Sequence, residues 1–316
     1  MTTANLVRHH SPEREWGEVA RLGGLLAFAR DRLAAAGADS PWLTALILLE
    51  DATGLGRTTV LAQPDLMVDT GQVARFQAMV ERRCRREPLA YIVGYREFFG
   101  RRFTVSPASL IPRPETESLV ELALERVDTS AGSKAGGAHS APTEDSFALL
   151  DVGTGSGAIV ISILAERGRV RAVATDAAPQ ALHVAIVNAR AHGVADRLKL
   201  IACDLASSVR QRFPLIVANL PYIRSADVSA LEPEISSYEP RAALDGGADG
   251  TTVVRRFLAQ LDGILAPGGA AILEMGEGQA DTLRSPVHDL GPDYQSQVAS
   301  DYTGTDRFLV LERAAV

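Results

Sequence analysis

The sequence predicts an α/β fold in which a doubly wound, mostly parallel sheet follows a small helical N-terminal domain. Three observations lead to this prediction. Strand-like runs alternate with helical segments from residue 147 onward, which is typical of a parallel sheet covered by helices. Residues 17–87 show helical periodicity instead. A glycine-rich turn, GTGSG, follows the first strand-like run, at the edge where open α/β sheets bind ligands.

The composition is that of an ordinary globular protein. A chain of 316 residues is long enough for two domains. The net charge of -7 gives no general reason to expect binding to nucleic acid or to a membrane surface. No apolar run approaches the length of about 18 residues that a membrane span needs. Cys84 and Cys203 form no C-x-x-C pair, so we expect neither a zinc site nor a disulfide framework, and a cytoplasmic location fits.

The first part of the chain divides into a lead-in and a helical domain. Residues 1–16 are polar, without the apolar core of a secretory signal, and we expect them to be flexible. Residues 17–87 form the predicted helical domain. Ser40 and Pro41 suit the start of a helix. A further helix is predicted from Thr70, and its apolar residues at helical spacing are Val73, Phe76, Val80 and Cys84.

The residue composition changes at the end of the predicted helical domain. Residues 88–113 are aromatic and β-branched with Gly94 and Gly100 between them, which predicts a β-hairpin or an extended connector. Residues 114–316 form the second predicted domain, which begins with a helix after a proline-rich turn. Residues 128–146 are small and polar, and we expect a flexible insertion there.

The second domain contains six strand-like runs separated by helical segments. Such alternation predicts a doubly wound sheet. The runs are residues 147–152, 171–176, 198–204, 214–219, 270–276 and 306–313.

The glycine-rich loop points to a particular class of ligand. A dinucleotide site favours G-x-G-x-x-G with a pyrophosphate on the helix N-terminus. This loop is G-x-G-x-G and follows an acid, so a nicotinamide-dependent oxidoreductase fits poorly. The acid disfavours a pyrophosphate and suits an ammonium group, which S-adenosyl-L-methionine carries together with a sulfonium. The candidate ligand contacts are Asp151, Gly153, Thr154, Gly155, Ser156 and Gly157.

Two later strand ends extend this candidate site. Asp176 ends the second run, where an acid can accept both ribose hydroxyls of an adenosine. Asp204, or its neighbour Leu205, ends the third run, where a side chain can flank the adenine ring. The alternative is a glycine turn that only packs a helix on a strand. The loop, Asp176 and Asn219 together favour donor binding.

The segment Asn219-Leu220-Pro221-Tyr222 begins with the last residue of the fourth run. A planar amide nitrogen is a poor nucleophile because its lone pair is delocalised. The Asn219 side-chain oxygen and the Leu220 carbonyl can accept its N–H groups and hold it in line with a methyl donor. Pro221 biases Leu220 to extended backbone, and Tyr222 offers a flat face for stacking. The alternative is a simple turn, in which Asn and Pro are common.

Several motifs together resemble the release factor glutamine methyltransferases, the HemK/PrmC family. The resemblance spans about residues 20–316 and includes EPLAYIVGYREFFGRRFTVSP, LIPRPETESLVELAL, LLDVGTGSGAIVISILAE, YEPRAALDGGADG and LAPGGAAILEMGEGQ. It implies a Rossmann-like, S-adenosylmethionine-dependent methyltransferase that leaves S-adenosyl-L-homocysteine. The implied substrate is the glutamine of a Gly-Gly-Gln motif in class I peptide chain release factors, methylated on its side-chain nitrogen. The helical domain would help to hold that partner.

The resemblance also assigns residues. The segment from Gly153 to Gly157, together with Asp176 and Asn219, would bind the donor, and the segment from Asn219 to Tyr222 would hold the glutamine. Two positions depart from the family pattern. Leu220 replaces the first proline of the usual Asn-Pro-Pro-Tyr, and Leu205 stands where some members carry a tryptophan.

Two alternatives remain open from the sequence. Asn-Leu-Pro-Tyr is also typical of ribosomal RNA adenine N6-methyltransferases, but these lack the PRPETE connector, and the acidic net charge disfavours a large nucleic-acid footprint. A non-catalytic donor-binding scaffold is the other. We therefore expect a protein partner, no nucleic acid or membrane partner, and a monomer.

Two acidic features have two interpretations each. Arg113, Glu115 and Glu117 in PRPETE either complement the start of a helix or close the site over the donor. Glu274, at a late strand end, either supports the site from behind or is a solvated acid.

Overall fold

A computed structural model describes residues 20–132 and 146–315. It divides the chain into two compact units, of which the first ends at Val93 and the second begins at Gly94. The sequence pattern placed this boundary after residue 87. The difference is α5 (Leu89–Val93), whose Ile92 packs in the core of the N-terminal unit. The predicted lead-in, residues 1–16, lies outside the described residues.

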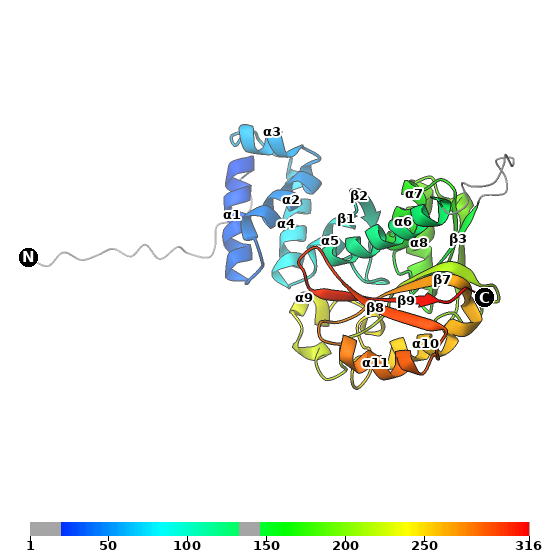
Figure 1. Cartoon of the computed structure of the whole chain (residues 1–316). Helices are drawn as coiled ribbons and strands as arrows, with labels where there is room; N and C mark the ends of the chain where they lie inside the picture. The colour runs from blue at the N-terminus through cyan, green and yellow to red at the C-terminus, as the bar shows by residue number, and fades with distance from the viewer. Residues whose placement is uncertain (1–19, 133–145, 316) are drawn as a thin grey trace, which may run out of the picture. The chain divides into compact units, whose positions relative to one another are not determined.

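The N-terminal unit is a helical domain (Figure 1). Its α2 begins at Pro41, as the Ser40-Pro41 pair predicted, although the Ser40 side chain forms no capping hydrogen bond, and its α4 begins at Thr70, as the helical spacing predicted. Asp69 and Gln72 form a capping box at the start of α4, which satisfies backbone N–H groups that a helix leaves unpaired. Buried leucines and Phe76 form the core. The longer helices are α1 (Leu22–Ala35), α2 (Pro41–Thr53), α3 (Arg57–Ala62) and α4 (Thr70–Cys84).

The second unit begins with the predicted hairpin, β1 (Tyr95–Phe98) and β2 (Arg101–Thr104). Asn188 fastens the hairpin to the rest of the unit. Its side chain accepts the N–H of Thr104 at 2.8 Å and donates to the carbonyls of Thr104 and Ser156 at 3.0 and 2.9 Å. The Asn188 side chain therefore connects the hairpin to the glycine-rich loop.

A short 3-10 helix, η2 (Pro114–Thr116), leads into α6 (Glu117–Gly132). Residues 128–132 of the predicted insertion are therefore helical. The Thr129 and Ser130 hydroxyls donate to carbonyls one turn back, and Asp128 forms an ion pair with Arg167 at 2.7 Å, so polar residues extend the helix. Residues 133–145 of that insertion lie outside the described part.

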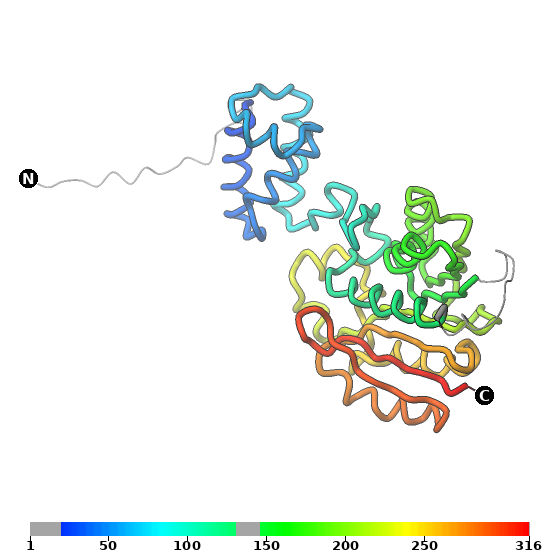
Figure 2. Tube along the Cα trace, turned by 45° about the horizontal axis from the view of Figure 1, so that its top comes forward, coloured from blue at the N-terminus to red at the C-terminus, as the bar shows by residue number. Residues whose placement is uncertain are grey.

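A seven-stranded sheet forms the centre of the second unit, in the order β5-β4-β3-β6-β7-β9-β8. The neighbours from β5 to β7 are parallel, and β9 is antiparallel to both β7 and β8, which confirms the doubly wound, mostly parallel prediction. Figure 2 shows the last strands beside β7. The strands are β3 (Phe147–Val152), β4 (Val170–Asp176), β5 (Leu198–Ala202), β6 (Phe213–Asn219), β7 (Leu265–Glu274), β8 (Tyr294–Ser300) and β9 (Asp306–Arg313).

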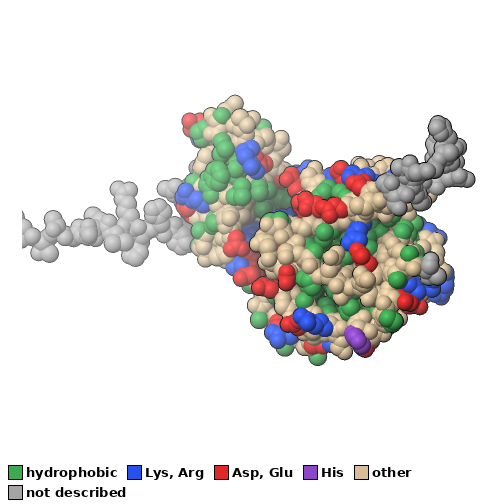
Figure 3. All heavy atoms as spheres, viewed as in Figure 1, with side chains coloured by type: hydrophobic (Ala, Val, Ile, Leu, Met, Phe, Trp, Pro, Cys, Tyr) green, Lys and Arg blue, Asp and Glu red, His purple; other side chains and the backbone are tan. Residues whose placement is uncertain are grey.

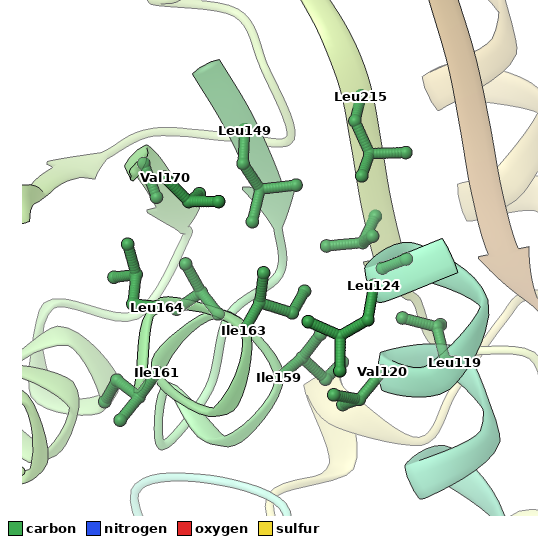
Figure 4. Close-up of a cluster of buried hydrophobic side chains, with 14 of the residues drawn as sticks. Leu119, Val120, Leu124, Leu149, Ile159, Ile161, Ile163, Leu164, Val170 and Leu215 are labelled. Atoms are coloured by element: carbon green, nitrogen blue, oxygen red, sulfur yellow. The ribbon is translucent and has the colours of Figure 1, made fainter. Parts of the chain in front are cut away.

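Helices cover both faces of the sheet (Figure 1). Leu149 of β3 and Leu215 of β6 point into a core with α6 and α7 (Figure 4). Leu150 and Ile216 point to the other face, where α10 packs. The remaining helices are α7 (Ala158–Glu166), α8 (Pro179–Ala191), η3 (Ala195–Arg197), η4 (Val228–Ala230), α9 (Pro233–Ser236), η5 (Arg241–Ala243), α10 (Thr252–Ile264) and α11 (Ala280–His288).

Strand alternation decides which strand-end side chains meet. Successive residues of a strand face opposite sides. Leu215 and Val217 face α6, so Asn219 does as well, and Ala270 and Ile272 place Glu274 on that same face. Since Asn219 and Glu274 are register partners, their side chains lie next to each other beneath the start of α6.

Three details of the sheet differ from the sequence prediction. The strand β5 ends at Ala202, before Asp204, and β7 begins already at Leu265, in a stretch that reads as a turn. The strand β8 was not predicted, because it is an exposed edge strand without a buried apolar face. Within residues 20–132 and 146–315, no helix combines the length and apolar character needed to cross a membrane.

Candidate active site

The site lies where the strand order reverses, between β3 and β6. Chain connections leave this point in opposite directions, and open α/β sheets bind ligands in the resulting crevice. Val152 pairs with both Thr175 and Ala218. The first residues after β3, the end of β4 and the end of β6 are therefore brought to one edge.

A cavity of about 270 Å³ opens at this edge. Its lining brings together most of the predicted site residues, which come from four strand ends: Gly153, Thr154, Gly155, Ser156, Asp176, Asp204, Leu205, Asn219, Leu220 and Pro221. Three predicted residues do not line it. Asp151 is buried beneath the glycine-rich loop, Gly157 is the last residue of that loop, and Tyr222 follows Pro221.

Asp176 organises the glycine-rich loop. One of its carboxylate oxygens accepts the N–H of Gly155 at 2.8 Å, and the other accepts the N–H of Ala178 at 2.8 Å. Each oxygen retains a further lone pair for a ligand hydroxyl. Gly153 and Gly157 have φ values of 75° and 81°, which favour glycine. A Cβ on Gly157 would also lie 2.7 Å from Ile161 Cδ1 and 3.3 Å from Ala185 Cβ, so a side chain there would add crowding to the unfavourable φ.

Asp151 is fully buried beneath the loop. Its Oδ2 accepts a hydrogen bond from the Thr154 hydroxyl at 2.6 Å, whereas Oδ1 has no hydrogen-bond partner among the described residues. Burial, with a smaller contribution from the charge of Asp176, raises the pKa of Asp151 to about 7. A buried, incompletely paired carboxyl group beside the loop suits a cationic ligand.

Asp204 and Leu205, the two residues predicted at the far end of the cavity, have different environments. Asp204 is exposed and forms an ion pair with Arg256 of α10. Leu205 is buried with a left-handed φ of 50°, which is uncommon for a residue with a side chain. Leu205 therefore supplies an apolar wall at the position predicted to flank the adenine.

Asn219 belongs to a series of hydrogen bonds that runs from the cavity lining to the buried Glu274. Its Nδ2 donates to the Thr116 hydroxyl at 3.2 Å, and that hydroxyl donates to Oε2 of Glu274 at 2.7 Å. The phenol of Tyr222 donates to Oε1 of Glu274 at 3.3 Å. Glu274 is buried, so it is not a solvated acid. Burial raises the pKa of Glu274 and also that of Tyr222, where the Glu274 charge adds to the effect.

The PRPETE segment closes one side of the cavity. Arg113 and Thr116 belong to the lining. Arg113 forms an ion pair with the buried Glu239 at 2.6 Å, and Glu239 also accepts the N–H of Ile111 at 3.2 Å. Glu117 instead accepts the N–H of Phe99 at 2.8 Å. The ion pair between Arg113 and Glu239 therefore joins the PRPETE segment to the YEPRAALDGGADG segment over the site.

Sequence reasoning missed three residues here: Thr116, Arg256 and the ion-pairing role of Glu239. Thr116 belongs to the PRPETE segment, but its residue type is ordinary for the first turn of a helix. Its place in that segment was the indication in the sequence that it lies near the site. Arg256 lies in α10, where an arginine on an amphipathic helix reads as a solvated charge.

The residues present fit S-adenosyl-L-methionine. Asp176 has lone pairs for the ribose hydroxyls, Leu205 offers an apolar wall for the adenine, and Asp151 is a buried carboxyl group beneath the loop, whose ionised form a cationic ligand would favour. The parallel sheet, the glycine-rich loop and the acid after the second strand define an S-adenosylmethionine-dependent methyltransferase.

Comparison with known proteins agrees with this class and narrows it. The family model of the PrmC N-terminal domain matches residues 24–94, and that of the methyltransferase small domain matches residues 138–236. Among solved structures, the hMettl16 catalytic domain in complex with MAT2A 3'UTR hairpin 6 has a TM-score of 0.51 and 12% identity, over 78% of this chain and 82% of that one. At this identity the likeness concerns the fold alone.

Curated relatives give the family. The release factor glutamine methyltransferase of Nitratidesulfovibrio vulgaris is 38% identical, over 93% of this chain and 96% of its own length. That of Moorella thermoacetica is 40% identical, over 89% of this chain and 95% of its own length. The chain belongs to the release factor glutamine methyltransferase family.

Proposed function

We propose that this chain transfers the methyl group of S-adenosyl-L-methionine to the side-chain amide nitrogen (N5) of the glutamine in the Gly-Gly-Gln motif of class I peptide chain release factors. Asn219 carries this proposal. Its amide lines the cavity beside the glycine-rich loop, and its nitrogen is already engaged by Thr116. The amide oxygen remains available as an acceptor, which matches the N–H groups of a glutamine side chain.

The donor supplies an electrophilic methyl group on a sulfonium. The residues of this chain then act by positioning and electrostatics. Asn219 Oδ1 and the Leu220 carbonyl accept the two N–H groups of the glutamine amide, which holds its nitrogen toward the methyl group. Accepting both N–H groups also favours the pyramidal nitrogen that attack requires. No strong general base is needed, because the proton becomes acidic once the nitrogen is methylated.

Pro221 and Tyr222 support this arrangement. Pro221 keeps Leu220 extended, so that the carbonyl turns outward. Tyr222 offers its ring to the planar amide, and two contacts hold it: its phenol to Glu274, and its carbonyl to the Gln279 side chain at 2.8 Å. The donor is held by the glycine-rich loop, Asp176 and Leu205, and S-adenosyl-L-homocysteine leaves as the product.

The N-terminal unit is the proposed docking domain for the release factor. Figure 3 shows hydrophobic side chains exposed on one face of this unit. Exposed large hydrophobic residues in it include Trp42, Leu61 and Met67, with exposed fractions of 44%, 46% and 62%. Exposed apolar residues of this size mark interaction surfaces when they cluster. We further propose that the protein works as a monomer in the cytoplasm.

A direct test incubates the purified chain with labelled donor and either a class I release factor or ribosomal RNA. Mass spectrometry then locates the added methyl group. The proposal expects a single methyl on the glutamine of Gly-Gly-Gln and none on RNA. Methylated adenine with an unmodified release factor would reassign the substrate, and donor binding without any transfer would indicate a scaffold.

A further inference from the structure

Three side chains from distant parts of the sequence meet behind the substrate-binding segment. Thr116 comes from η2, Asn219 from the end of β6 and Glu274 from the end of β7. The hydroxyl of Thr116 stands between the other two, 3.2 Å from Asn219 Nδ2 and 2.7 Å from Glu274 Oε2. Thr116 and Glu274 are both buried.

The direction of each hydrogen bond in this chain follows from chemistry. An ionised carboxylate only accepts hydrogen bonds, so Glu274 in its ionised form takes the one hydroxyl proton of Thr116. Thr116 is then left as an acceptor toward Asn219. The two ends of an asparagine amide have nearly the same shape, and here the hydroxyl selects the nitrogen. Among the described residues, no donor is hydrogen-bonded to Oδ1 of Asn219.

We propose that Thr116 and Glu274 are positioning residues, which hold the Asn219 amide with Oδ1 facing the substrate nitrogen. The inference rests on the proposed function, in which Oδ1 accepts an N–H of the glutamine. A reversed amide would present N–H groups to the N–H groups of the substrate. Thr116 and Glu274 therefore act on the reaction through the orientation of Asn219.

Glu274 has a defined set of neighbours. Tyr222 donates to its other oxygen, and Arg307 of β9 and Glu115 of η2 are the charged groups that face it. The Arg307 charge favours the ionised carboxylate, whereas burial and Glu115 oppose it. The same carboxylate thus directs both Asn219, through Thr116, and the phenol of Tyr222.

The first test compares Thr116→Val with Thr116→Ser in the full chain, using release factor as the substrate. Valine keeps the shape and loses the hydroxyl, whereas serine keeps the hydroxyl. We expect kcat to fall at least tenfold in Thr116→Val and to stay within threefold of wild type in Thr116→Ser, with donor affinity unchanged within twofold in both. Equal kcat values for the two variants would overturn the proposal.

Ser162→Ala is the control for removing a buried hydroxyl. Ser162 lies in α7, is fully buried, and its hydroxyl has no partner among the described residues. Its kcat and donor affinity should match wild type. A loss in this variant equal to that of Thr116→Val would mean that any buried hydroxyl matters, which contradicts a specific role.

A second readout does not depend on turnover. In ¹⁵N-labelled protein, the Asn219 side-chain amide signals are assigned by their loss in Asn219→Ala. We expect one amide proton to exchange slowly in wild type and in Thr116→Ser, and rapidly in Thr116→Val. If wild type fails to methylate the release factor, the proposed function fails, while this measurement still decides the orientation. Fast exchange of both Asn219 amide protons in wild type would contradict the inference.

The pH profile of kcat separates positioning from simple packing. Burial raises the pKa of Glu274 above its ordinary value, which is about 4.3. Once protonated, Glu274 can donate a hydrogen bond to the Thr116 hydroxyl. That hydroxyl can then donate to Asn219, which favours the reversed orientation of the Asn219 amide. We expect wild-type kcat to fall on the acid side and this limb to be absent in Glu274→Gln. An identical acid limb in both proteins would contradict the inference.

Discussion

Asn219 is the residue on which the proposed chemistry depends most directly. Its amide touches the substrate nitrogen in the proposed complex and lies at the edge of the donor site. We expect Asn219→Ala to lower kcat by about 100-fold (~2.7 kcal/mol), because one of two acceptors for the glutamine amide is lost. Donor affinity, measured by calorimetry, should change by less than about threefold, a difference below 1 kcal/mol. Comparable losses in both would contradict the assigned role.

Asp151 predicts a dependence of stability on pH. Its folded-state pKa of about 7 lies above the ordinary value of about 3.9, so the folded protein binds this proton more tightly than the unfolded chain. The resulting stabilisation is complete below about pH 4 and is lost as the pH rises through about 7. The loss is on the order of 4 kcal/mol at most.

Urea unfolding of wild type and Asp151→Asn measures this effect. Between pH 5 and pH 8, as an approximate window set by that shift, the free energy of unfolding of wild type should decline relative to that of the variant. Taking the difference between the two proteins removes the contributions of other acids, including Glu274. Parallel pH dependences in the two proteins would show that Asp151 is not perturbed.

Single residues also show where sequence reasoning reached its limit. The roles expected of Asp176 and Asn219 followed from their position after strands, which the sequence displays. Thr116 acquires its importance only from Asn219 and Glu274, which lie far away in the sequence and reach it through tertiary packing. A hydroxyl whose proposed role is to orient another side chain produces no recognisable pattern in the local sequence.

At the scale of elements, the end of β6 combines chemistry with packing. Leu220 is buried, with an exposed fraction of 3%, and belongs to the core beside α10. Its Cδ2 would lie 3.2 Å from a Cβ on Gly153, so the leucine packs over the glycine-rich loop. The side chain therefore has a structural contact in addition to the carbonyl expected to bind the glutamine.

Leu220→Pro separates these two contributions. The carbonyl is retained, so kcat should stay within about tenfold of wild type (~1.4 kcal/mol). The smaller proline buries less apolar surface, and the free energy of unfolding should fall by about 1–3 kcal/mol. Steady-state kinetics and denaturant unfolding check the two parts. Abolished turnover in a stable variant would give the leucine side chain a role in the reaction itself.

The parallel strands could be predicted because both of their faces are buried. A run such as FALLDV in β3 is apolar throughout most of its length, and its turn residues mark its end. The strand β8, YQSQVAS, lies at the edge and exposes most of its side chains, so neither an apolar run nor an alternation identifies it. The pairing with β9 holds it in place.

At the scale of the whole molecule, the N-terminal unit is proposed to bind the release factor, and the second unit is proposed to carry out methyl transfer. Trp42 is exposed in the N-terminal unit and is the largest of the exposed apolar side chains among residues 20–93. We expect Trp42→Ser to raise KM for the release factor at least fivefold, which corresponds to about 1 kcal/mol. Donor affinity and kcat at saturating release factor should not change, because the donor site lies within the second unit.

Tyr302→Ser is the matched control for this prediction. Tyr302 is an exposed aromatic residue of the second unit, with an exposed fraction of 65%, and it lies outside the cavity lining. Its KM for the release factor should equal that of wild type. If both variants, or neither, raise KM, then the docking surface is not on the N-terminal unit at Trp42.

The strand order has a consequence for the order of synthesis. The strand β9 comes after β8 in the sequence but lies between β7 and β8 in the sheet. Its Phe308 pairs with Glu274, and the carbonyl of Arg307 accepts the N–H of Met275. While a ribosome makes this chain, β7 therefore has an open edge until residues 306–313 have emerged. An enzyme proposed to modify the machinery that ends translation thus completes the strand pairing behind its own site only after β9 has been made.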